Sequence, residues 1–435
     1  MRKTQLVGLV LAVLAIAGCG GGGGGGGSSA SSPGGGGGGG GGGQTIVASG
    51  PNVVTMTVDG GPSCSTSSSQ CSVDIPYITV TLCVSGTTQC QTFDHIEVDS
   101  GSYGLRILAD AKDTSGNTFS LALAQETVNG SPVVECTQFV DGYSWGPIKT
   151  ADVQVSSESA HAVPVQVIGD PNYSRVPSAC SGTGTQEDTV ATFGANGILG
   201  VGPFAQDCGT NCAQTVSNGY YYACPTSTCQ PTTLALADQV TDPVTDFQTD
   251  NNGVIVEMPP LGASGTASTV TGSLVFGIGT EGNNSMSAPT VLTADNYGYI
   301  RTNFNGQSLP YSFLDTGSNA YYFNDSSIPD SCLSQGNWFC PASTLQLSAT
   351  NLGQNGVQST VSISIANAKT VFNQYPSNSA FNDIGVNAGN QSAFCPNGAS
   401  NCSFDFGLPF FFGRNVYVAF YGALTSAGTG PYFAY

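Results

Sequence analysis

The sequence predicts an all-β protein body, and three observations favour that class. Short runs rich in β-branched residues recur along the chain, for example at 53–58 and 361–365. Turn-forming clusters such as Asp59-Gly60-Gly61 and Asn251-Asn252-Gly253 separate the runs. Helical periodicity is scarce, and 232–240 is the best short candidate. A chain of 435 residues can form two core-forming units or one large β body.

The N-terminus has the features of an export signal. Arg2 and Lys3 precede an apolar run, 6–17, that is too short to remain as a membrane anchor. The run ends in Ile16-Ala17-Gly18-Cys19, which resembles the lipobox of bacterial lipoproteins, where the cysteine is acylated after cleavage. We therefore expect a signal peptide at 1–18 and a lipidated Cys19. An ordinary signal peptide that happens to contain a cysteine is the alternative.

A glycine-rich segment follows the predicted lipidation site. It consists almost entirely of glycine and serine and cannot bury a core. The sequence therefore predicts that 19–48 is a lipidated cysteine with a flexible tether, about 30 Å long as a random coil. Gly20 directly after the cysteine resembles lipoproteins sorted to an outer membrane. The expected location is the bacterial envelope, with the body held to the membrane by its lipid.

The charge is strongly acidic. The chain has 28 acidic residues against 9 lysines and arginines, a formal net charge of −19. Such a surface repels nucleic acids and anionic lipid headgroups. A nucleic-acid partner is therefore set aside.

The cysteines indicate an oxidising compartment. The chain contains 15, an odd number, and removal of Cys19 for lipidation leaves fourteen. Neighbouring cysteines suit short disulfides across loops and hairpins, although sequence alone does not prove the pairing. The couples are Cys64/Cys71, Cys83/Cys90, Cys136/Cys180, Cys208/Cys212, Cys224/Cys229, Cys332/Cys340 and Cys395/Cys402. A zinc site is disfavoured, because the chain has two histidines and no C-x-x-C pair.

Two short segments repeat one pattern. Ile96-Glu97-Val98-Asp99-Ser100-Gly101-Ser102 and Ser312-Phe313-Leu314-Asp315-Thr316-Gly317-Ser318 each run from a predicted strand into Asp, a hydroxyl residue, Gly and Ser. A single copy also fits an ordinary tight turn, because Asp and Gly are common in turns. Two copies, each after a strand, are more specific. The pattern predicts that Asp99 and Asp315 are paired catalytic carboxylates.

The residue types fit acid–base chemistry. Gly101 and Gly317 allow sharp loops, the hydroxyls of Ser100 and Thr316 can bridge to the opposite loop, and those of Ser102 and Ser318 can donate to the carboxylates. Two carboxylates held close together cannot both ionise easily, so they share a proton. One then deprotonates a water while the other protonates a carbonyl oxygen.

These segments resemble the catalytic loops of pepsin-like aspartic peptidases, and further segments follow in the order of that family. Residues 139–146 resemble its flap, the hairpin that closes over substrate, and 197–202 resemble the segment that packs behind the first catalytic loop. Residues 272–277 resemble the stretch where the first lobe ends, and 406–420 the corresponding segment of the second lobe. The resemblance implies a bilobal pepsin-like fold with a cleft between two pseudo-symmetric β lobes. We expect an N-terminal lobe at 49–285, with the flap and a cysteine-rich insertion, and a C-terminal lobe at 286–435.

The same resemblance assigns substrate contacts to Phe139, Asp141, Gly142 and Tyr143 in the flap. The chain also departs from the family. Phe139 stands where a tyrosine is usual, and Arg106 where a tryptophan is frequent. Asp405 interrupts the second hydrophobic-hydrophobic-Gly element, and 208–229 looks like an insertion on the edge of the cleft. The pattern also resembles an exported bacterial family catalogued as a domain of unknown function.

The expected function is that of an aspartic endopeptidase that needs no metal or cofactor, acts as a monomer and takes polypeptide as its substrate. The alternative is a catalytically silent pepsin-like lipoprotein that binds a peptide or an envelope component. A triad of His95 with Ser100 or Ser102 is disfavoured, because the chain lacks a G-x-S-x-G elbow. Paired carboxylates that share a hydrogen bond below open space favour the enzyme; separated carboxylates or a plugged cleft favour the binder.

Overall fold

The computed structural model describes residues 49–64, 71–140, 142–216, 219–225, 228–286, 290–334, 336–389, 395 and 401–435. The predicted signal peptide, Cys19, the tether and Asp141 lie outside the described residues. Strands dominate and helices are short, so the all-β prediction is confirmed. Within the described residues, no helix is long and apolar enough to cross a membrane.

The described residues of the first part of the chain form sixteen strands and six short helical segments. The strands are β1 (Val53–Val58), β2 (Pro76–Val84), β3 (Cys90–Asp99), β4 (Tyr103–Leu108), β5 (Ala124–Gln125), β6 (Thr127–Val128), β7 (Ser131–Gln138), β8 (Gly142–Val155), β9 (Glu158–Ile168), β10 (Thr185–Gln186), β11 (Gly197–Val201), β12 (Tyr221–Ala223), β13 (Gln230–Pro231), β14 (Gly253–Met258), β15 (Thr266–Ala267) and β16 (Val270–Phe276). The helical segments are η1 (Pro171–Tyr173), α1 (Ser178–Ser181), α2 (Val190–Phe193), α3 (Gly209–Gln214), η2 (Leu236–Asp238) and η3 (Pro243–Asp246).

The second part is also mainly β. Its strands are β17 (Val291–Thr293), β18 (Ile300–Phe304), β19 (Gln307–Leu314), β20 (Tyr321–Phe323), β21 (Leu345–Leu352), β22 (Gln358–Ile365), β23 (Ala380–Phe381), β24 (Gly385–Asn387), β25 (Asp405–Phe406), β26 (Arg414–Ala419), β27 (Leu424–Thr425), β28 (Gly428–Thr429) and β29 (Tyr432–Ala434). Its helical segments are α4 (Ala368–Gln374) and η6 (Leu408–Phe410).

The predicted strands lie inside observed ones, whereas the one predicted helix does not form as expected. The runs at 53–58 and 361–365 are β1 and part of β22. The segment 232–240 forms only the single 3₁₀ turn η2. The Gln239 amide instead donates at 2.9 Å to the carbonyl of Gly209, outside the segment, and to that of Leu234, within it. The Leu234 N–H donates to the Cys212 carbonyl at 2.9 Å. Tertiary contacts override a weak local helical preference here.

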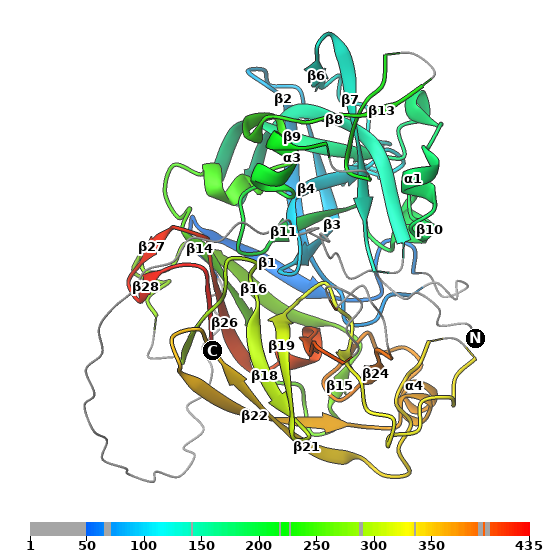
Figure 1. Ribbon diagram of the computed structural model, residues 1–435, viewed down its shortest axis with the longest axis vertical. Helices are drawn as coiled ribbons and strands as arrows, with labels where there is room; N and C mark the ends of the chain where they lie inside the picture. Colours follow the sequence, from blue (N-terminus) through cyan, green and yellow to red (C-terminus); the bar gives the residue numbers. More distant parts are fainter. Residues whose placement is uncertain are drawn as a thin grey trace.

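The fold has two lobes joined by a shared sheet, as the bilobal prediction requires. In Figure 1 the strands β2 to β13 form the upper lobe, and β18, β19, β21 and β22 lie in the lower one. Between them runs a sheet in the order β17–β29–β26–β14–β16–β1, all antiparallel. Strands from both sides of the predicted lobe boundary at 285/286 belong to this sheet, so the C-terminal segment returns to pair with the N-terminal one.

Each lobe repeats the same local arrangement. In the upper lobe, β11 lies between β3 and β4, parallel to β3 and antiparallel to β4. In the lower lobe, β25 lies between β19 and β20, again parallel to the first and antiparallel to the second. The loop from β3 to β4 and the loop from β19 to β20 are therefore pseudo-symmetric counterparts.

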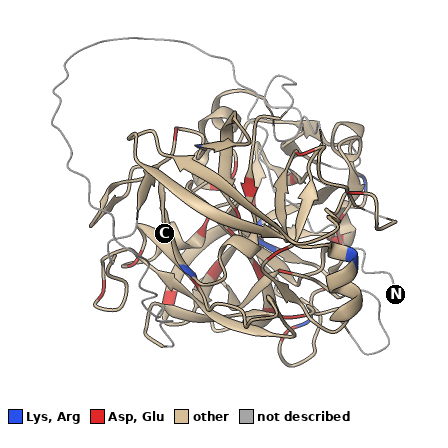
Figure 2. Cartoon of the chain, turned by 90° about the horizontal axis from the view of Figure 1, so that it is seen from below, with Lys and Arg blue, Asp and Glu red and all other residues tan. Residues whose placement is uncertain are grey.

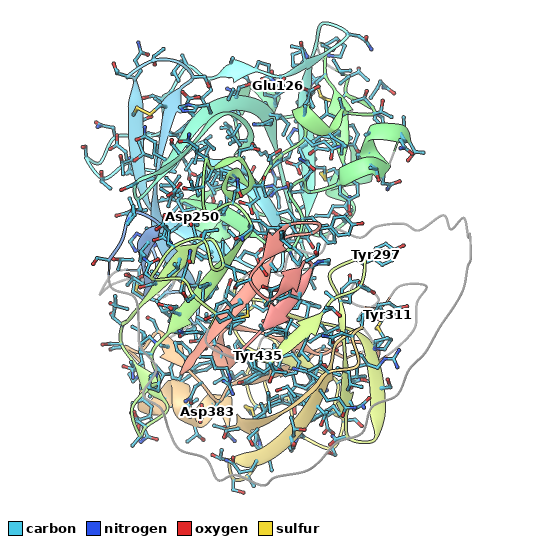
Figure 3. The ribbon with its side chains drawn as sticks, turned by 90° about the vertical axis from the view of Figure 1, so that its left-hand side faces the viewer. Glu126, Asp250, Tyr297, Tyr311, Asp383 and Tyr435 are labelled. Atoms are coloured by element: carbon cyan, nitrogen blue, oxygen red, sulfur yellow. A yellow bond between two sulfur atoms is a disulfide. The ribbon has the colours of Figure 1, made fainter. Side chains whose placement is uncertain are left out.

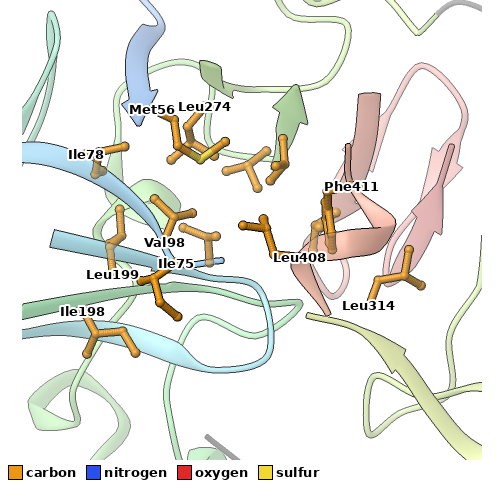
Figure 4. Close-up of a cluster of buried hydrophobic side chains, with 14 of the residues drawn as sticks. Met56, Ile75, Ile78, Val98, Ile198, Leu199, Leu274, Leu314, Leu408 and Phe411 are labelled. Atoms are coloured by element: carbon orange, nitrogen blue, oxygen red, sulfur yellow. The ribbon is translucent and has the colours of Figure 1, made fainter. Parts of the chain in front are cut away.

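A continuous hydrophobic core supports both loops. Val98 and Leu314, the residues directly before the two motif aspartates, are fully buried, as are Leu199 and Leu408 from the strand and turn beside them. Figure 4 shows these side chains gathered around Met56 and neighbouring residues of the central sheet. Burial of an aliphatic side chain of this size contributes about 1.5–3 kcal/mol. The core therefore fixes the position of each motif aspartate at the end of its strand.

Seven disulfides join the seven neighbouring couples that the sequence suggests. Six of them close loops of four to eight residues, and one, Cys136–Cys180, spans 44. Bonds of this number persist in an oxidising environment, which indicates an exported protein. Figure 2 shows acidic residues spread over both lobes with few basic ones among them.

Candidate active site between the two loops

The first loop is built on the end of β3. Asp99 is the last residue of that strand, and β11 runs beside it with Leu199 opposite Val98 and Gly200 opposite Asp99. A Cβ atom at Gly200 would lie 2.4 Å from the backbone nitrogen of Tyr103. Glycine is required at this position because the loop folds back directly over the strand.

The second loop has the same construction. Asp315 directly follows β19, and β25 places Phe406 opposite Leu314. The backbone N–H of Asp315 donates to the Phe406 carbonyl at 3.0 Å. Gly407, which follows β25 as Gly200 follows Leu199, is equally confined, because a Cβ atom there would lie 2.1 Å from the Ala320 carbonyl oxygen.

Four hydrogen bonds lock the two loops together. Thr316 Oγ1 donates to the Val98 carbonyl at 2.6 Å and accepts from the Ser100 N–H at 3.0 Å. The mirror-image pair runs the other way: Ser100 Oγ donates to the Leu314 carbonyl at 3.0 Å and accepts from the Thr316 N–H at 3.0 Å. All these groups are buried, so each hydroxyl uses its single proton and one lone pair inside the protein.

The interlock places the two carboxyl groups against each other. Asp99 and Asp315 are 0 % exposed and hydrogen-bond to one another. Each also accepts from the N–H two residues on: Gly101 N to Asp99 Oδ1 at 2.7 Å, and Gly317 N to Asp315 Oδ1 at 2.9 Å. A Cβ atom on Gly101 would lie 2.6 Å from Asp315 Cγ, and one on Gly317 would lie 2.6 Å from Asp99 Oδ1. Only glycine therefore permits this approach.

The electrostatics of the pair are unequal. Burial raises the pKa of Asp99, but hydrogen bonds from its neighbours and the positive charge of Arg106 oppose the rise. Burial also raises the pKa of Asp315, and there the negative charges of Asp99 and Asp405 raise it further, well above the usual range for aspartate. Two buried carboxyls in direct contact retain one proton between them.

The two motif serines, Ser102 and Ser318, are both buried, and Ser318 contacts two carboxyl groups. Its Oγ lies 3.0 Å from Asp315 Oδ2 and 2.6 Å from Asp405 Oδ2. Ser102 occupies the matching place in the first loop and is 1 % exposed. All eight motif residues named from the sequence therefore lie together at the junction of the lobes.

The predicted flap is a hairpin of β7 and β8. Gln138 pairs with Tyr143, and Phe139 N donates to the Gly142 carbonyl at 2.8 Å, which closes the turn. The tip reaches the other lobe, because Val140 packs against Phe313, two residues before Asp315. The hairpin therefore lies closed over the junction of the lobes.

The side chains of two residues predicted to contact substrate, Phe139 and Tyr143, are packed inside the protein in this closed structure. The Phe139 ring packs edge-on against Phe193 at 5.6 Å, inside the core. The Tyr143 side chain is buried with Trp145, and its hydroxyl donates to Gln186 Oε1 at 3.2 Å. The pleat and twist of the hairpin determine where the Phe139 and Tyr143 side chains point. The spacing of residues in the sequence does not determine these directions. Gly142 lies in the turn, against the Thr185 carbonyl, and Asp141 lies outside the described residues.

The cysteine-rich segment 208–229 supports the base of this hairpin. Its strand β12 pairs with β7, with Tyr222 opposite Val134. On β7, Cys136 forms a disulfide with Cys180 of α1. The segment thus extends the flap sheet.

A buried ion cluster lies behind the first loop and was not foreseen. The Arg106 guanidinium donates to Glu135 Oε1 at 2.8 Å, to Asp207 Oδ2 at 3.0 Å and to the Tyr103 carbonyl at 2.8 Å. Burial and the charge of Glu135 raise the pKa of Asp207 well above its usual range. Arg106 thus ties β4 to β7 and holds one positive charge near Asp99. The sequence signal was an arginine in a strand of otherwise apolar residues.

Tyr103 lies close enough to the two aspartates for their charges to act on it, and the sequence patterns did not single it out. Burial, followed by the charges of Tyr299, Asp99 and Asp315, raises the pKa of Tyr103. The Tyr103 ring packs edge-on against Phe204 at 5.2 Å, and Tyr299 packs against Tyr311 at 5.5 Å. Burial raises the pKa of Tyr299 to about 12. Figure 3 labels Tyr311, the ring against which Tyr299 packs.

The remaining candidates lie apart from this chemistry. His95 contacts Asp94 at 3.1 Å and Asp59 at 3.4 Å, which gives the ring partners other than the motif serines. In the part of the chain that the structure describes, no group of three histidine, cysteine or acidic side chains is arranged to hold a metal ion.

Comparisons with known proteins place the chain in a family. A family model described as "Protein of unknown function (DUF3443)" matches residues 48–435. No curated protein matches the chain. Among solved structures, an aspartic proteinase from Irpex lacteus is similar, with a TM-score of 0.47 and 18% identity over 88% of this chain and 96% of that one. The family match includes both motifs.

The interlock predicts a stability effect. Thr316→Val keeps the shape of the side chain but leaves the buried Ser100 N–H and Val98 carbonyl without their partner. We expect the free energy of unfolding to fall by about 1–3 kcal/mol, measured by urea denaturation. Thr350→Val is the matched control, since the Thr350 hydroxyl bonds to Thr360 at an exposed site. Equal effects of the two substitutions would contradict a structural role for the interlock.

The buried carboxyls predict a pH effect on stability. Burial raises the pKa of Asp383 to about 6 and that of Asp74 and Asp242 well above the usual range. A raised pKa means that the folded state binds protons that the unfolded state has released. The stability that these groups contribute is therefore greatest below about pH 4, the pKa of an unfolded aspartate, and is lost as pH rises through the folded pKa values.

We expect the thermal midpoint to fall between mildly acidic and neutral pH, measured by calorimetry across that range. Asp383→Asn should flatten the curve up to about pH 6 because it removes one such group. A thermal midpoint that rises toward neutral pH would contradict the raised pKa values of these buried aspartates.

Proposed function

Given that the chain belongs to the family of proteins of unknown function DUF3443, we propose from its own site that it is an aspartic endopeptidase. The observation that carries the proposal is the pair of fully buried, mutually hydrogen-bonded carboxyls, Asp99 and Asp315, held by two interlocked loops. A pair that retains one proton contains a base and an acid at one point, which is what addition of water to an amide requires.

The proposed reaction uses both carboxyls. The ionised carboxylate takes a proton from a bound water as the water oxygen bonds to the substrate carbonyl carbon. The protonated partner gives its proton to the carbonyl oxygen, which produces a tetrahedral diol. The carboxyl that took the water proton then passes it to the amide nitrogen, while its ionised partner takes a proton from one diol hydroxyl. The carbon–nitrogen bond breaks, an acid and an amine leave, and the pair again holds one proton. The N–H groups of Gly101 and Gly317 fix the carboxyl orientation throughout.

Substrate entry requires the hairpin to move. Both carboxyls are fully buried, and Val140 at the tip packs against Phe313 of the opposite lobe. The Cys136–Cys180 disulfide and the β12 pairing hold the base of β7. We therefore place the hinge near the tip, with a polypeptide entering in extended form beneath it.

The setting of the enzyme is part of the proposal. The export signal, the lipidated Cys19 and the 19–48 tether would hold a monomeric body at the bacterial envelope, with its substrate an exposed or unfolded polypeptide. The seven disulfides support export.

One observation favours a second function. Zero exposure of the carboxyls beneath a packed hairpin is also what a catalytically silent module would show. Such a module would bind a peptide or an envelope component without cleaving it, since a fold does not by itself determine activity.

Cleavage of a denatured protein by residues 45–435 separates the two functions. We expect cleavage at acidic pH, inhibited by a pepstatin-type compound. Asp99→Asn and Asp315→Asn should each lower the rate about a thousandfold, because each removes one acid–base group. The rate is measured from new amino termini.

Asp383→Asn is the control, since it removes a carboxyl of raised pKa that belongs to neither motif loop. Cleavage that survives Asp99→Asn or Asp315→Asn would contradict the dyad. Folded wild-type protein that cleaves nothing across a peptide library would favour the silent module.

A further inference from the structure

A third carboxyl lies beneath the second loop. Asp405 begins β25, is 0 % exposed, and sits opposite Phe313 of β19 and Tyr322 of β20. The matching position of the upper lobe follows from the two registers: Leu199 faces Val98 as Phe406 faces Leu314, so Ile198 corresponds to Asp405. One lobe therefore has an isoleucine and the other an acid at the same place.

The hydroxyl of Ser318 links this acid to the dyad. Ser318 Oγ lies 2.6 Å from Asp405 Oδ2 and 3.0 Å from Asp315 Oδ2. A serine hydroxyl has one proton to donate, and an ionised carboxylate can only accept. Both contacts can be hydrogen bonds only if one of the two carboxyls is protonated and donates to Ser318 Oγ.

The surroundings of Asp405 favour the protonated form. Its Oδ1 is buried and has no hydrogen-bond partner in the part of the chain that the structure describes. Burying an ionised carboxylate that accepts only one hydrogen bond costs free energy. The neutral acid carries no charge, so its burial costs less. Burial and the charge of Asp99 raise the pKa of Asp405 well above its usual range, against the hydrogen bond to Ser318. The titratable groups on the neighbouring elements are Asp99, Asp315, Tyr311, Tyr321 and Tyr322.

We propose that Asp405 is a positioning residue that keeps a reserve proton for the dyad and exchanges it with Asp315 through the hydroxyl of Ser318. The proposal rests on the proposed peptidase function. In the working state Asp405 donates to Ser318 Oγ and Ser318 donates to Asp315, while Asp99 and Asp315 share the dyad proton.

The relay is a balanced proton shift. When the dyad loses its proton to solvent, the Asp405 O–H bond breaks and its proton passes to Ser318 Oγ. The former Ser318 proton passes to Asp315 Oδ2, and the negative charge moves from Asp315 to Asp405. The dyad again has one proton. Activity is then lost only when a second proton leaves, which would put three negative charges in one buried site.

The consequence is a higher upper limit to the working pH. Asp405→Asn keeps an N–H donor for Ser318 but has no acidic proton to transfer. We expect the basic limb of the kcat/KM profile to move to lower pH by about one unit. Ser318→Ala, which leaves both carboxyls but removes the link, should move the limb in the same direction. The double substitution should do no more than either single one, because the two residues act as one unit.

Infrared titration of the protonated carboxyl band tests the proton reserve without catalysis. We expect Asp405→Asn to remove one protonated carboxyl at near-neutral pH and to lower the pH at which the remaining band titrates. If the protein cleaves nothing, this experiment still decides whether the proton is shared, so the two proposals fail separately.

Asp383→Asn is the control for the loss of a raised-pKa carboxyl elsewhere. Should Asp405→Asn not fold, Asp405→Ile copies the residue of the upper lobe and serves in its place. A carboxyl band and a pH profile that change no more than in Asp383→Asn, or effects of Asp405→Asn and Ser318→Ala that simply add, would overturn the proposal.

Discussion

The reciprocal hydrogen bonds between Ser100 and Thr316 are the constraint on which the remaining site depends. Each hydroxyl donates to a carbonyl on the opposite strand and accepts the other loop's N–H, so neither loop can move alone. This interlock holds Asp99 and Asp315 in contact, out of water, at the junction of two lobes. Like charges in that position cannot both persist, and the retained proton is the chemical property that the fold produces. The hydrophobic core beneath and the closed hairpin above both keep the pair away from bulk solvent.

The charged groups beside the two pseudo-symmetric loops differ. Beside the first loop, Arg106 supplies a positive charge that favours ionised Asp99. Beside the second, Asp405 raises the pKa of Asp315 once Asp405 is itself ionised. The two lobes repeat one strand arrangement, yet a cation stands near one aspartate and an acid near the other. Identical carboxyls thereby acquire different proton affinities, which is what separate acid and base roles require.

Sequence patterns predicted what depends on neighbours along the chain. Strand runs, the Asp-Ser/Thr-Gly loops and the seven cysteine couples are local signals, and most of the resulting contacts are local or follow from the repeated motif. The patterns could not predict where Phe139 and Tyr143 point, because hairpin twist and packing against Phe193 and Gln186 decide it. Nor could they assign partners to Arg106, whose carboxylates lie 29 and 101 residues away. In the sequence, Asp405 stood out only as a departure from the hydrophobic-hydrophobic-Gly pattern. Its role could not be predicted, because it depends on the hydrogen bond with Ser318, which lies 87 residues earlier in the chain.

Location of the protons by neutron diffraction from a deuterated crystal at mildly acidic pH tests the central claim most directly. The account predicts one deuteron between the carboxyls of Asp99 and Asp315, with the Thr316 and Ser100 hydroxyl deuterons directed at the Val98 and Leu314 carbonyls. Two fully ionised carboxylates, or hydroxyl deuterons directed away from the opposite loop, would contradict it.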